Sequence, residues 1–250
     1  MWLSDPENLF IAPDLRSPPE IPTLGADDLQ LFSFPGCASD HGSIDTAYFD
    51  LLSLAEKERA QGIKSPLNRA TFVQSRAHLR WLLGYHLGIP AQEVPLVMGA
   101  HGKPQHRDHG IQFNLSHSKD VIVMGMARGT EMGVDIEHPR SPRRLDALIR
   151  EVFSVQEQRW FEGLDETEQQ DLFLRGWTLK EAWVKTTGRG IAAGLSNVVI
   201  REDFQGFEAL PEGDPADFHL YESSFLSARM ALVHRGRPKK VHYYQGTIGY

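Results

Sequence analysis

Two acidic residues near the middle of the chain have the type and the spacing of a metal site. The segment Gly133-Val-Asp-Ile-Glu137 is typical of a buried strand, on which side chains alternate between two faces. Asp135 and Glu137 therefore share a face, which Gly133 leaves open. Because paired carboxylates repel each other unless a cation lies between them, the pattern favours a hard ion such as Mg²⁺. A strand edge whose acids face water is the alternative.

A second motif, Trp177-Thr-Leu-Lys-Glu-Ala-Trp-Val-Lys185, is typical of a helix. Residues four apart share a helix face, so Trp177, Glu181 and Lys185 form one stripe with Lys180 beside it. A Glu–Lys pair at this spacing commonly does no more than stabilise an exposed helix. The flanking tryptophans favour a partly buried face instead, where the acid and the base together would suit a metal ion and a phosphate.

Two further segments are polar and less specific. In Phe113-Asn-Leu-Ser-His-Ser118 an apolar strand ends in groups that can donate hydrogen bonds to phosphate oxygens, with an ordinary strand end as the alternative. In Gly102-Lys-Pro104 the lysine offers a point charge for phosphate. The flanking histidines could suggest a metal site, but no matching acid or cysteine pattern accompanies them, which favours a plain polar loop. Neither segment is a Walker loop or a dinucleotide-binding fingerprint.

The elements that must position these motifs alternate between helices and strands, which predicts the α+β class. Turn and stop residues separate segments of helical spacing from segments of alternating hydrophobic spacing. Helices are predicted at 45–62, 67–87, 143–152, 155–162 and 168–187. Strands are predicted at 29–34, 94–98, 111–115, 121–127, 132–137, 197–201, 217–222, 228–234 and 240–245.

The order of these elements favours two similar α+β halves. Residues 28–130 and 131–250 each contain a helix rich in arginine, lysine and tryptophan that ends in glycine. In both halves a Gly-Ile step and a strand follow that helix. Residues 1–27 contain five prolines and predict an extended N-terminal arm.

The overall composition limits the classes of protein that fit. The 250 residues carry a net charge of −7, which disfavours a nucleic-acid partner because nucleic-acid binders usually have a basic excess. A single cysteine, Cys37, excludes an intrachain disulfide and a cysteine zinc site. No apolar run reaches the roughly 20 residues that span a bilayer, and the acidic start lacks a secretory signal. We therefore expect a cytoplasmic protein without a membrane segment.

Taken in chain order, the four motifs resemble those of the Sfp-type 4′-phosphopantetheinyl transferases, over about residues 50–200. The resemblance implies two α/β halves related by a pseudo-twofold axis, with the active site in the cleft between them. It also implies an activity, the Mg²⁺-dependent transfer of the 4′-phosphopantetheine group from coenzyme A to a serine of an acyl or peptidyl carrier protein. The product that leaves would be 3′,5′-ADP.

The resemblance also implies roles for the charged residues of the two sharper motifs. Asp135 and Glu137 would bind Mg²⁺, and Glu181 would be the third metal ligand, the general base or both. Lys185 would contact the pyrophosphate of coenzyme A and take part in catalysis with Glu181.

Five other residues would bind coenzyme A if the resemblance holds. Ser116 and His117 would contact its phosphates, and Lys103 and Pro104 would lie along its adenosine part. Arg76 lies on the helix that supplies basic residues toward the nucleotide in this family.

The partner and two competing functions complete the expectations. Carrier proteins are acidic, so a basic cluster beyond the metal strand is a candidate docking surface, although an ordinary charged face is the alternative. Its members are Arg140, Arg143, Arg144 and Arg150. A monomer would suffice, since one chain holds both halves. A Mg²⁺-dependent nucleotidyl transferase and a non-catalytic coenzyme A-binding module are the competing functions, and the sequence does not indicate which carrier is served.

Overall fold

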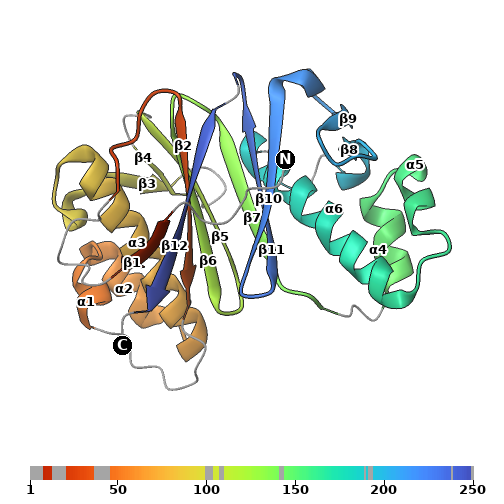
Figure 1. Cartoon of the computed structure of the whole chain (residues 1–250). Helices are drawn as coiled ribbons and strands as arrows, with labels where there is room; N and C mark the ends of the chain where they lie inside the picture. The colour runs from red at the N-terminus through yellow and green to blue at the C-terminus, as the bar shows by residue number, and fades with distance from the viewer. Residues whose placement is uncertain are drawn as a thin grey trace.

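Two sheets, each packed against one long helix, form the frame of the molecule (Figure 1). The mixture of helices and sheets agrees with the predicted α+β class. Within the part of the chain that is described, no helix is long and apolar enough to cross a membrane. The computed structural model describes residues 8–12, 21–36, 46–98, 104–106, 110–140, 144–188, 190, 194–237 and 239–248.

The first sheet has five strands. In spatial order they are β1 (Asn8–Ala12), β12 (Lys240–Ile248), β2 (Asp28–Pro35), β6 (Val121–Arg128) and β5 (Ile111–Ser118). The β2–β6 and β6–β5 pairs are antiparallel, whereas β12 pairs in parallel with both β1 and β2. The chain's last strand therefore lies in the sheet that its first residues begin.

The long helix of this half is bounded by local signals. The helices are α1 (Thr46–Asp50), α2 (Leu54–Gly62) and α3 (Pro66–Leu87). The single helix predicted at 45–62 is wrong, because Ser53 starts a new helix by forming a capping box with Glu56. In α3 the Ser65 side chain accepts from the Asn68 amide, and Gly88 ends the helix in the left-handed conformation with φ 68°. A 3₁₀ turn, η1 (Ala91–Glu93), and a short hairpin, β3 (Leu96–Met98) with β4 (Pro104–His106), follow.

The second sheet has three antiparallel strands and its own long helix. The strands are β7 (Met132–Glu137), β11 (Ala228–Arg235) and β10 (Phe218–Phe225), in that order. Between β7 and β10 the chain forms α4 (Leu145–Val152), α5 (Val155–Gln158), η2 (Arg159–Phe161), α6 (Glu166–Thr187), η4 (Leu195–Asn197), β8 (Val199–Ile200), β9 (Phe207–Ala209) and η5 (Pro215–Asp217). Asp165 caps α6 at its start, and Gly188 ends it with φ 71°.

The same order of elements occurs twice along the chain. A strand, two short helices, a 22-residue helix, a 3₁₀ turn, a two-stranded hairpin and two long antiparallel strands appear first from β2 to β6 and again from β7 to β11, where η2 and η5 are additional. This recurrence is what two similar halves would produce, while the pseudo-twofold axis and the division at residue 130 stay predictions. β12 departs from that division, because it joins the first sheet from the predicted second half.

The predicted N-terminal arm, residues 1–27, is described in two pieces. Residues 8–12 form β1, and the Ile21 and Ala26 carbonyls accept from Tyr85 and from Lys239. Gln30 and Tyr85 donate to the Pro22 and Ile21 carbonyls, at 2.8 and 2.5 Å. Residues 1–7 and 13–20 lie outside the described part.

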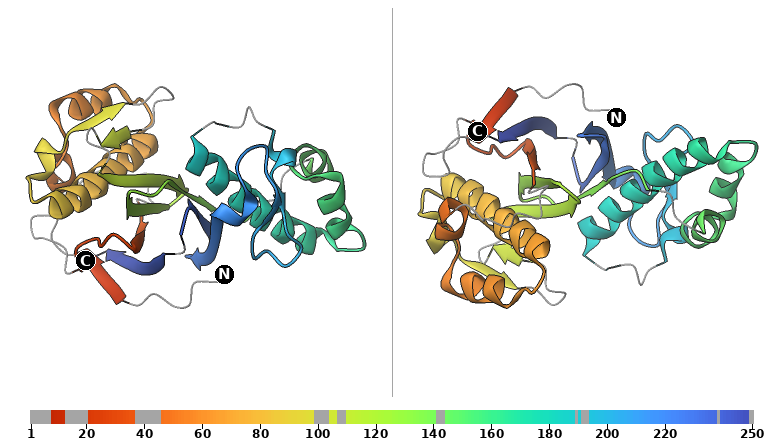
Figure 2. Two further views of the ribbon diagram at one scale, coloured as in Figure 1. Left: turned by 90° about the horizontal axis from the view of Figure 1, so that it is seen from above. Right: turned by 90° about the horizontal axis from the view of Figure 1, so that it is seen from below.

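Three apolar clusters hold the layers together. One lies between α3 and the first sheet, and one lies between α6 and the second sheet. The third joins the two sheets, with Leu29 and Leu31 of β2 in the same cluster as Val134 and Ile136 of β7. Figures 1 and 2 show the result, in which the helices of the two halves lie on the outer sides and the sheets lie between them.

Candidate active site

A pocket of about 830 Å³ lies where the two halves meet. Its walls come from α3 and β5 on one side and from β7 and α6 on the other. Seven predicted site residues line it: Arg76, Ser116, His117, Asp135, Glu137, Glu181 and Lys185. Lys103 and the side chain of Pro104 lie outside the described residues, and the Pro104 backbone pairs with Met98 in the β3–β4 hairpin.

The two strand carboxylates enter the pocket together, as their alternation predicts. Asp135 is 4% exposed, and its Oδ1 accepts from Ser116 Oγ at 2.9 Å and from Lys185 Nζ at 2.6 Å. Burial raises the pKa of Asp135, while the nearby Lys185 ammonium opposes that rise. Glu137 accepts from Ser118 Oγ at 3.2 Å.

Gly133 has a different role from the predicted one. A Cβ atom at this position would lie 2.2 Å from the Ala182 carbonyl oxygen and 2.5 Å from the Thr186 amide nitrogen. The α6 backbone therefore rests directly on β7 at Gly133, and this part of the strand face is covered by the helix. The absence of a side chain lets α6 approach closely enough to place its acid and its base beside Asp135.

The α6 face contributes the third carboxylate and the ammonium group. Glu181 Oε1 and Asp135 Oδ2 are both buried without a hydrogen-bond partner. Burial raises the pKa of Glu181, and the charges of Asp135 and Glu137 raise it further. Lys185 Nζ also donates to Ser116 Oγ at 2.8 Å. This end of the pocket thus holds three carboxylates and one lysine.

The residues at this end suit a hard cation by their chemistry. Two unpartnered carboxylate oxygens in a buried acidic cluster match the all-oxygen ligands of Mg²⁺, which commonly keeps waters or phosphate oxygens as further ligands. Among the described residues, however, no three His, Cys, Asp or Glu side chains already form a group that could hold a metal. Protein side chains alone therefore do not complete a metal site here, because Asp135 Oδ1 already accepts a hydrogen bond from the Lys185 ammonium group.

Lys180, which the sequence placed beside the charged stripe, points away from the pocket. It is fully buried, and Nζ donates to Glu157 Oε2 at 2.7 Å and to the carbonyls of Val152 and Leu195 at 3.0 and 3.3 Å. Burial lowers the pKa of Lys180 to about 8, with Glu157 opposing that change. Lys180 therefore connects α6 to α4, α5 and η4 on the side away from the pocket, and it does not line the site.

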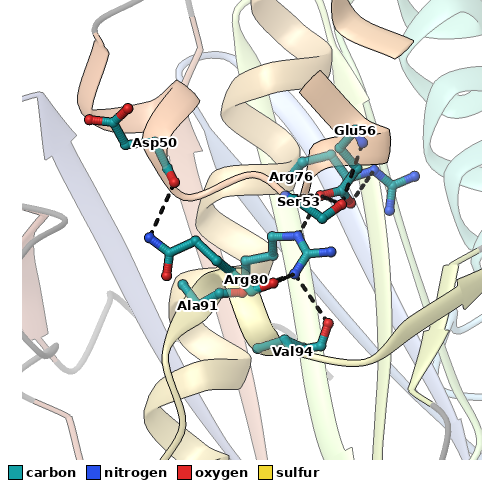
Figure 3. A network of polar contacts seen from close by, with 8 residues as sticks. Asp50, Ser53, Glu56, Arg76, Arg80, Ala91 and Val94 are labelled. Atoms are coloured by element: carbon teal, nitrogen blue, oxygen red, sulfur yellow. Dashed lines mark hydrogen bonds and ion pairs between the residues drawn. The ribbon is translucent and has the colours of Figure 1, made fainter. Parts of the chain in front are cut away.

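The α3 wall of the pocket carries a basic group. Arg76 is 7% exposed, and its Nη1 is buried without a partner, although its Nε lies 3.9 Å from Glu56 (Figure 3). Burial lowers the pKa of Arg76, and Glu56 partly opposes the effect. Its guanidinium carbon lies 5.5 Å from the centre of the Phe72 ring. An unpaired guanidinium donor beside an aromatic ring is suited to an anionic, ring-bearing ligand.

Comparison with known proteins assigns the chain to a family. The family model for the 4′-phosphopantetheinyl transferase superfamily matches residues 131–233. The 4′-phosphopantetheinyl transferase HetI of Nostoc sp. is 32% identical over 182 residues, which are 71% of this chain and 76% of HetI. The 4′-phosphopantetheinyl transferase psf-1 of Bacillus pumilus is 33% identical over 138 residues, 54% of this chain and 58% of psf-1.

The chain belongs to the 4′-phosphopantetheinyl transferase superfamily. The predicted Sfp-type resemblance and the predicted enzyme class are thereby confirmed. Within this transferase, the matched range contains Asp135, Glu137, Glu181 and Lys185, whereas Arg76 and the β5 residues lie outside it. The role of each residue stays a prediction.

Sequence reasoning missed the contacts of two polar residues of this transferase with β7, the strand that carries Asp135 and Glu137. Asn114 Oδ1 accepts from the Val134 amide at 3.0 Å, and Ser118 Oγ bonds both Glu137 and the His138 amide. A signal was present, because Asn114, Ser116 and Ser118 alternate along one strand and so share a face. Their common target became visible only when β5 and β7 were placed side by side.

Proposed function

We propose that this transferase moves the 4′-phosphopantetheine group of coenzyme A onto a serine hydroxyl of an acyl or peptidyl carrier protein, releasing 3′,5′-ADP. The observation that supports it most is that one pocket is lined by Arg76 from α3 and by three carboxylates with Lys185 from β7 and α6. Coenzyme A has a separate 3′-phosphate and a pyrophosphate. A single pocket with a free guanidinium Nη1 on one wall and a metal-binding carboxylate group on the other would bind both groups.

Asp135, Glu137 and Glu181 would hold Mg²⁺, with phosphate oxygens of coenzyme A completing the ligands. When bound, the ion would neutralise charge on the pyrophosphate oxygens and so stabilise the leaving group. Burial, and then the neighbouring carboxylates, raise the pKa values of Asp135 and Glu181, and a bound cation would offset this cost of holding them ionised.

Lys185 and Glu181 would perform the steps that the chain's own residues can supply. Lys185 Nζ, which donates to Ser116 Oγ at 2.8 Å, would bind a pyrophosphate oxygen with another of its three N–H groups. Glu181, whose pKa is raised, would accept the proton of the carrier serine. The serine oxygen then bonds to the phosphorus nearest pantetheine, and the bond from that phosphorus to the oxygen of 3′,5′-ADP breaks.

The nucleotide would lie toward α3 and β5. Arg76 would donate to a phosphate from its unpartnered Nη1, and Phe72 would contact the ring system. Ser116 and His117 would contact phosphate oxygens. Lys103 and Pro104 would follow the adenosine, which is a prediction from the sequence alone.

The carrier protein would dock beside the acidic end. Arg140 is 54% exposed, lies 3.8 Å from Glu137 and sits over the Trp177 ring, and Arg144 and Arg150 are also exposed. Arg143 lies outside the described residues. Changing Arg143 and Arg144 to glutamate should raise the KM for an acidic carrier and leave coenzyme A binding intact. An unchanged carrier KM would remove this docking surface.

One thermal-shift comparison separates coenzyme A from a nucleotide as the substrate. With Mg²⁺ present, coenzyme A should raise the Tm more than ATP at equal concentration. Only coenzyme A has both a pyrophosphate for the carboxylate wall and a separate 3′-phosphate for Arg76. A larger shift with ATP would favour the nucleotidyl transferase that the carboxylates alone also permit.

The transfer itself is tested by the intact mass of a purified apo carrier protein after incubation with this protein, coenzyme A and Mg²⁺. The carrier should gain the mass of one phosphopantetheine arm, and the gain should vanish with EDTA and return with excess Mg²⁺. We also expect the protein to act in the cytoplasm. We expect a monomer, because one chain supplies both walls of the pocket. No mass gain across carriers of fatty acid, polyketide and nonribosomal peptide pathways would refute the proposal.

A further inference from the structure

The metal strand β7 has one edge that no strand covers in the described part of the molecule. β11 pairs with one side of β7, and the other side faces β5 of the first sheet without strand pairing. An uncovered strand edge leaves backbone N–H groups that need acceptors once they are buried. The position of β7 relative to the first half is therefore not fixed by a main-chain ladder.

Side chains of β5 supply the missing acceptors. Asn114 Oδ1 accepts from the Val134 N–H at 3.0 Å, and Ser118 Oγ accepts from the His138 N–H at 3.2 Å. Val134 directly precedes Asp135, and His138 directly follows Glu137. The two bonds therefore hold the backbone at both ends of the Asp-Ile-Glu segment.

The same strand also orients the carboxylates between these two bonds. Ser116 Oγ donates to Asp135 at 2.9 Å, and Ser118 Oγ donates to Glu137 at 3.2 Å. One hydroxyl can do both tasks of Ser118, because it has one donor hydrogen and two acceptor lone pairs. Each predicted metal ligand of β7 thus receives a hydroxyl from the opposite half.

The burial of Asn114 shows that this arrangement is specific. Asn114 is 2% exposed, and an apolar residue there would leave the buried Val134 N–H without an acceptor. A further contact continues the connection past Ser118, since His138 Nε2 lies 3.1 Å from Asp120 Oδ1. The β5–β7 contact is therefore polar and directional at the level of the carboxylates.

We infer that Asn114 and Ser118 are positioning residues that fix the two β7 carboxylates for metal binding by hydrogen bonds from the opposite half. The inference rests on the proposed function only in taking Asp135 and Glu137 as metal ligands. Groups that hydrogen-bond to metal ligands commonly change metal affinity by roughly 10- to 100-fold when they are removed. Ser116 is left out of the test, because it is also proposed to contact coenzyme A.

The test measures metal binding without turnover. Mn²⁺ is titrated into the protein with coenzyme A present and no carrier protein, and free Mn²⁺ is read from its electron paramagnetic resonance signal after subtraction of the Mn²⁺ that coenzyme A binds by itself. Ser118→Ala should weaken Mn²⁺ binding by roughly tenfold, and Ser118→Thr, which keeps the hydroxyl, should restore it. Asn114→Ala should act in the same direction, and Asn114→Asp, which keeps the oxygen acceptor, should be closer to wild type.

Ser33→Ala is the matched control. Ser33 is a buried strand serine of the same sheet whose hydroxyl pairs with Tyr243 OH at 2.9 Å. Its loss should lower the Tm without changing Mn²⁺ binding. Ser118 carries the test because it is only half-buried, so that Ser118→Ala should fold even if Asn114→Ala does not.

The outcomes separate this inference from the proposed function. If wild type modifies the carrier and binds Mn²⁺, but Ser118→Ala binds Mn²⁺ as tightly as wild type, the positioning role is wrong and the transferase proposal stands. A weakening in Ser33→Ala equal to that in Ser118→Ala would also overturn it, because the effect would then be general. If wild type modifies no carrier, the proposed function fails, whatever Ser118 does.

Discussion

The long helices of the two halves share an internal cation at the same position. Arg80 is the fifteenth residue of α3, and Lys180 is the fifteenth residue of α6. Both side chains are almost fully buried, and each bonds the carbonyls of the 3₁₀ turn that follows its own helix. Figure 3 shows this arrangement in the first half, where Arg80 Nη1 donates to the carbonyls of Ala91 and Val94.

The acid that pairs with each cation also comes from the same place. Glu56 and Glu157 are each the third residue of a short helix, and each completes a capping box with a serine. Glu56 pairs with Arg80, and Glu157 pairs with Lys180. One structural device, an N-terminal glutamate held by a cation of the long helix, is therefore present in both halves.

The halves differ one residue further along each helix. Trp81 packs in the apolar core of the first half, whereas Glu181 lines the pocket. Four residues later, Tyr85 donates to the Ile21 carbonyl and Lys185 donates to Asp135. The same arrangement of elements therefore supplies different pocket residues in the two halves. The second half supplies the three acids and Lys185, and the first half supplies Arg76, whose Nη1 has no partner.

Gly133→Ala should have the largest effect, since it attacks a contact particular to the second half. A methyl group there would overlap the α6 backbone, which cannot move aside as a flexible side chain can. We expect a loss of about 5 kcal/mol or more in unfolding free energy, measured by urea titration with circular dichroism. Gly62→Ala in the first half, where the added methyl meets nothing within 4 Å, is the control. Equal urea midpoints for both variants would show that α6 does not depend on this contact.

Removing the buried cations compares the shared device directly. Lys180→Met leaves Glu157 unpaired at 0% exposure and should cost about 3–5 kcal/mol. Arg80→Met should cost less, because the Glu56 side chain is 14% exposed and Arg76 remains 3.9 Å away. Urea unfolding of both variants measures the difference in unfolding free energy. A larger loss for Arg80→Met would contradict the expectation that the more deeply buried pair is the costlier one to disrupt.

Acid should destabilise both halves through buried histidines, of which His78 and His234 give one from each half. Burial lowers the pKa of His78 and of His234 to about 4. In the unfolded chain these groups protonate near pH 6.5, so the unfolded state binds more protons between pH 6.5 and 4. The contribution is intact above pH 6.5 and falls as the pH drops toward 4, by about 2 kcal/mol for each histidine at pH 5.

Unfolding midpoints at pH 7 and pH 5 check this expectation. His78→Leu and His234→Leu should each show a smaller loss between the two pH values than wild type. A loss that neither variant reduces would mean that other groups cause the acid sensitivity.

The smallest effect should come from the exposed arginines at the pocket aromatics. Arg59 lies 5.1 Å from the Phe72 ring centre, and Arg140 lies 5.9 Å from that of Trp177. Such exposed cation–π contacts contribute about 0.5–1 kcal/mol. Arg59→Ala and Arg140→Ala should each lower the unfolding free energy by no more than this. A loss above about 2 kcal/mol in either would assign that arginine to the packing of its half.

Local signals account for what the sequence predicted well. The ends of α3 and α6 follow from their own caps, Ser65 and Asp165 at the starts and Gly88 and Gly188 at the ends. The shared face of Asp135 and Glu137 follows from strand alternation, which needs no tertiary information.

Long-range contacts account for what the sequence could not provide. The place of β12 beside β2 depends on pairing between residues about 200 positions apart, which no local pattern encodes. Helical spacing puts Lys180 beside the charged stripe, but it cannot reveal that Lys180 is buried against Glu157, because Glu157 lies on another helix. The task of Gly133 depends on the approach of α6, and that of Asn114 depends on the free edge of β7.

The division of tasks between the halves is tested most directly by measuring transfer while Mg²⁺ and coenzyme A are varied separately. Asp135→Asn should raise the Mg²⁺ concentration for half-maximal rate, whereas Arg76→Ala should raise the KM for coenzyme A by roughly tenfold, as expected for one lost charge-assisted hydrogen bond. The account predicts that each variant changes its own constant and leaves the other near wild type. Equal shifts of both constants in both variants, or of neither, would contradict it.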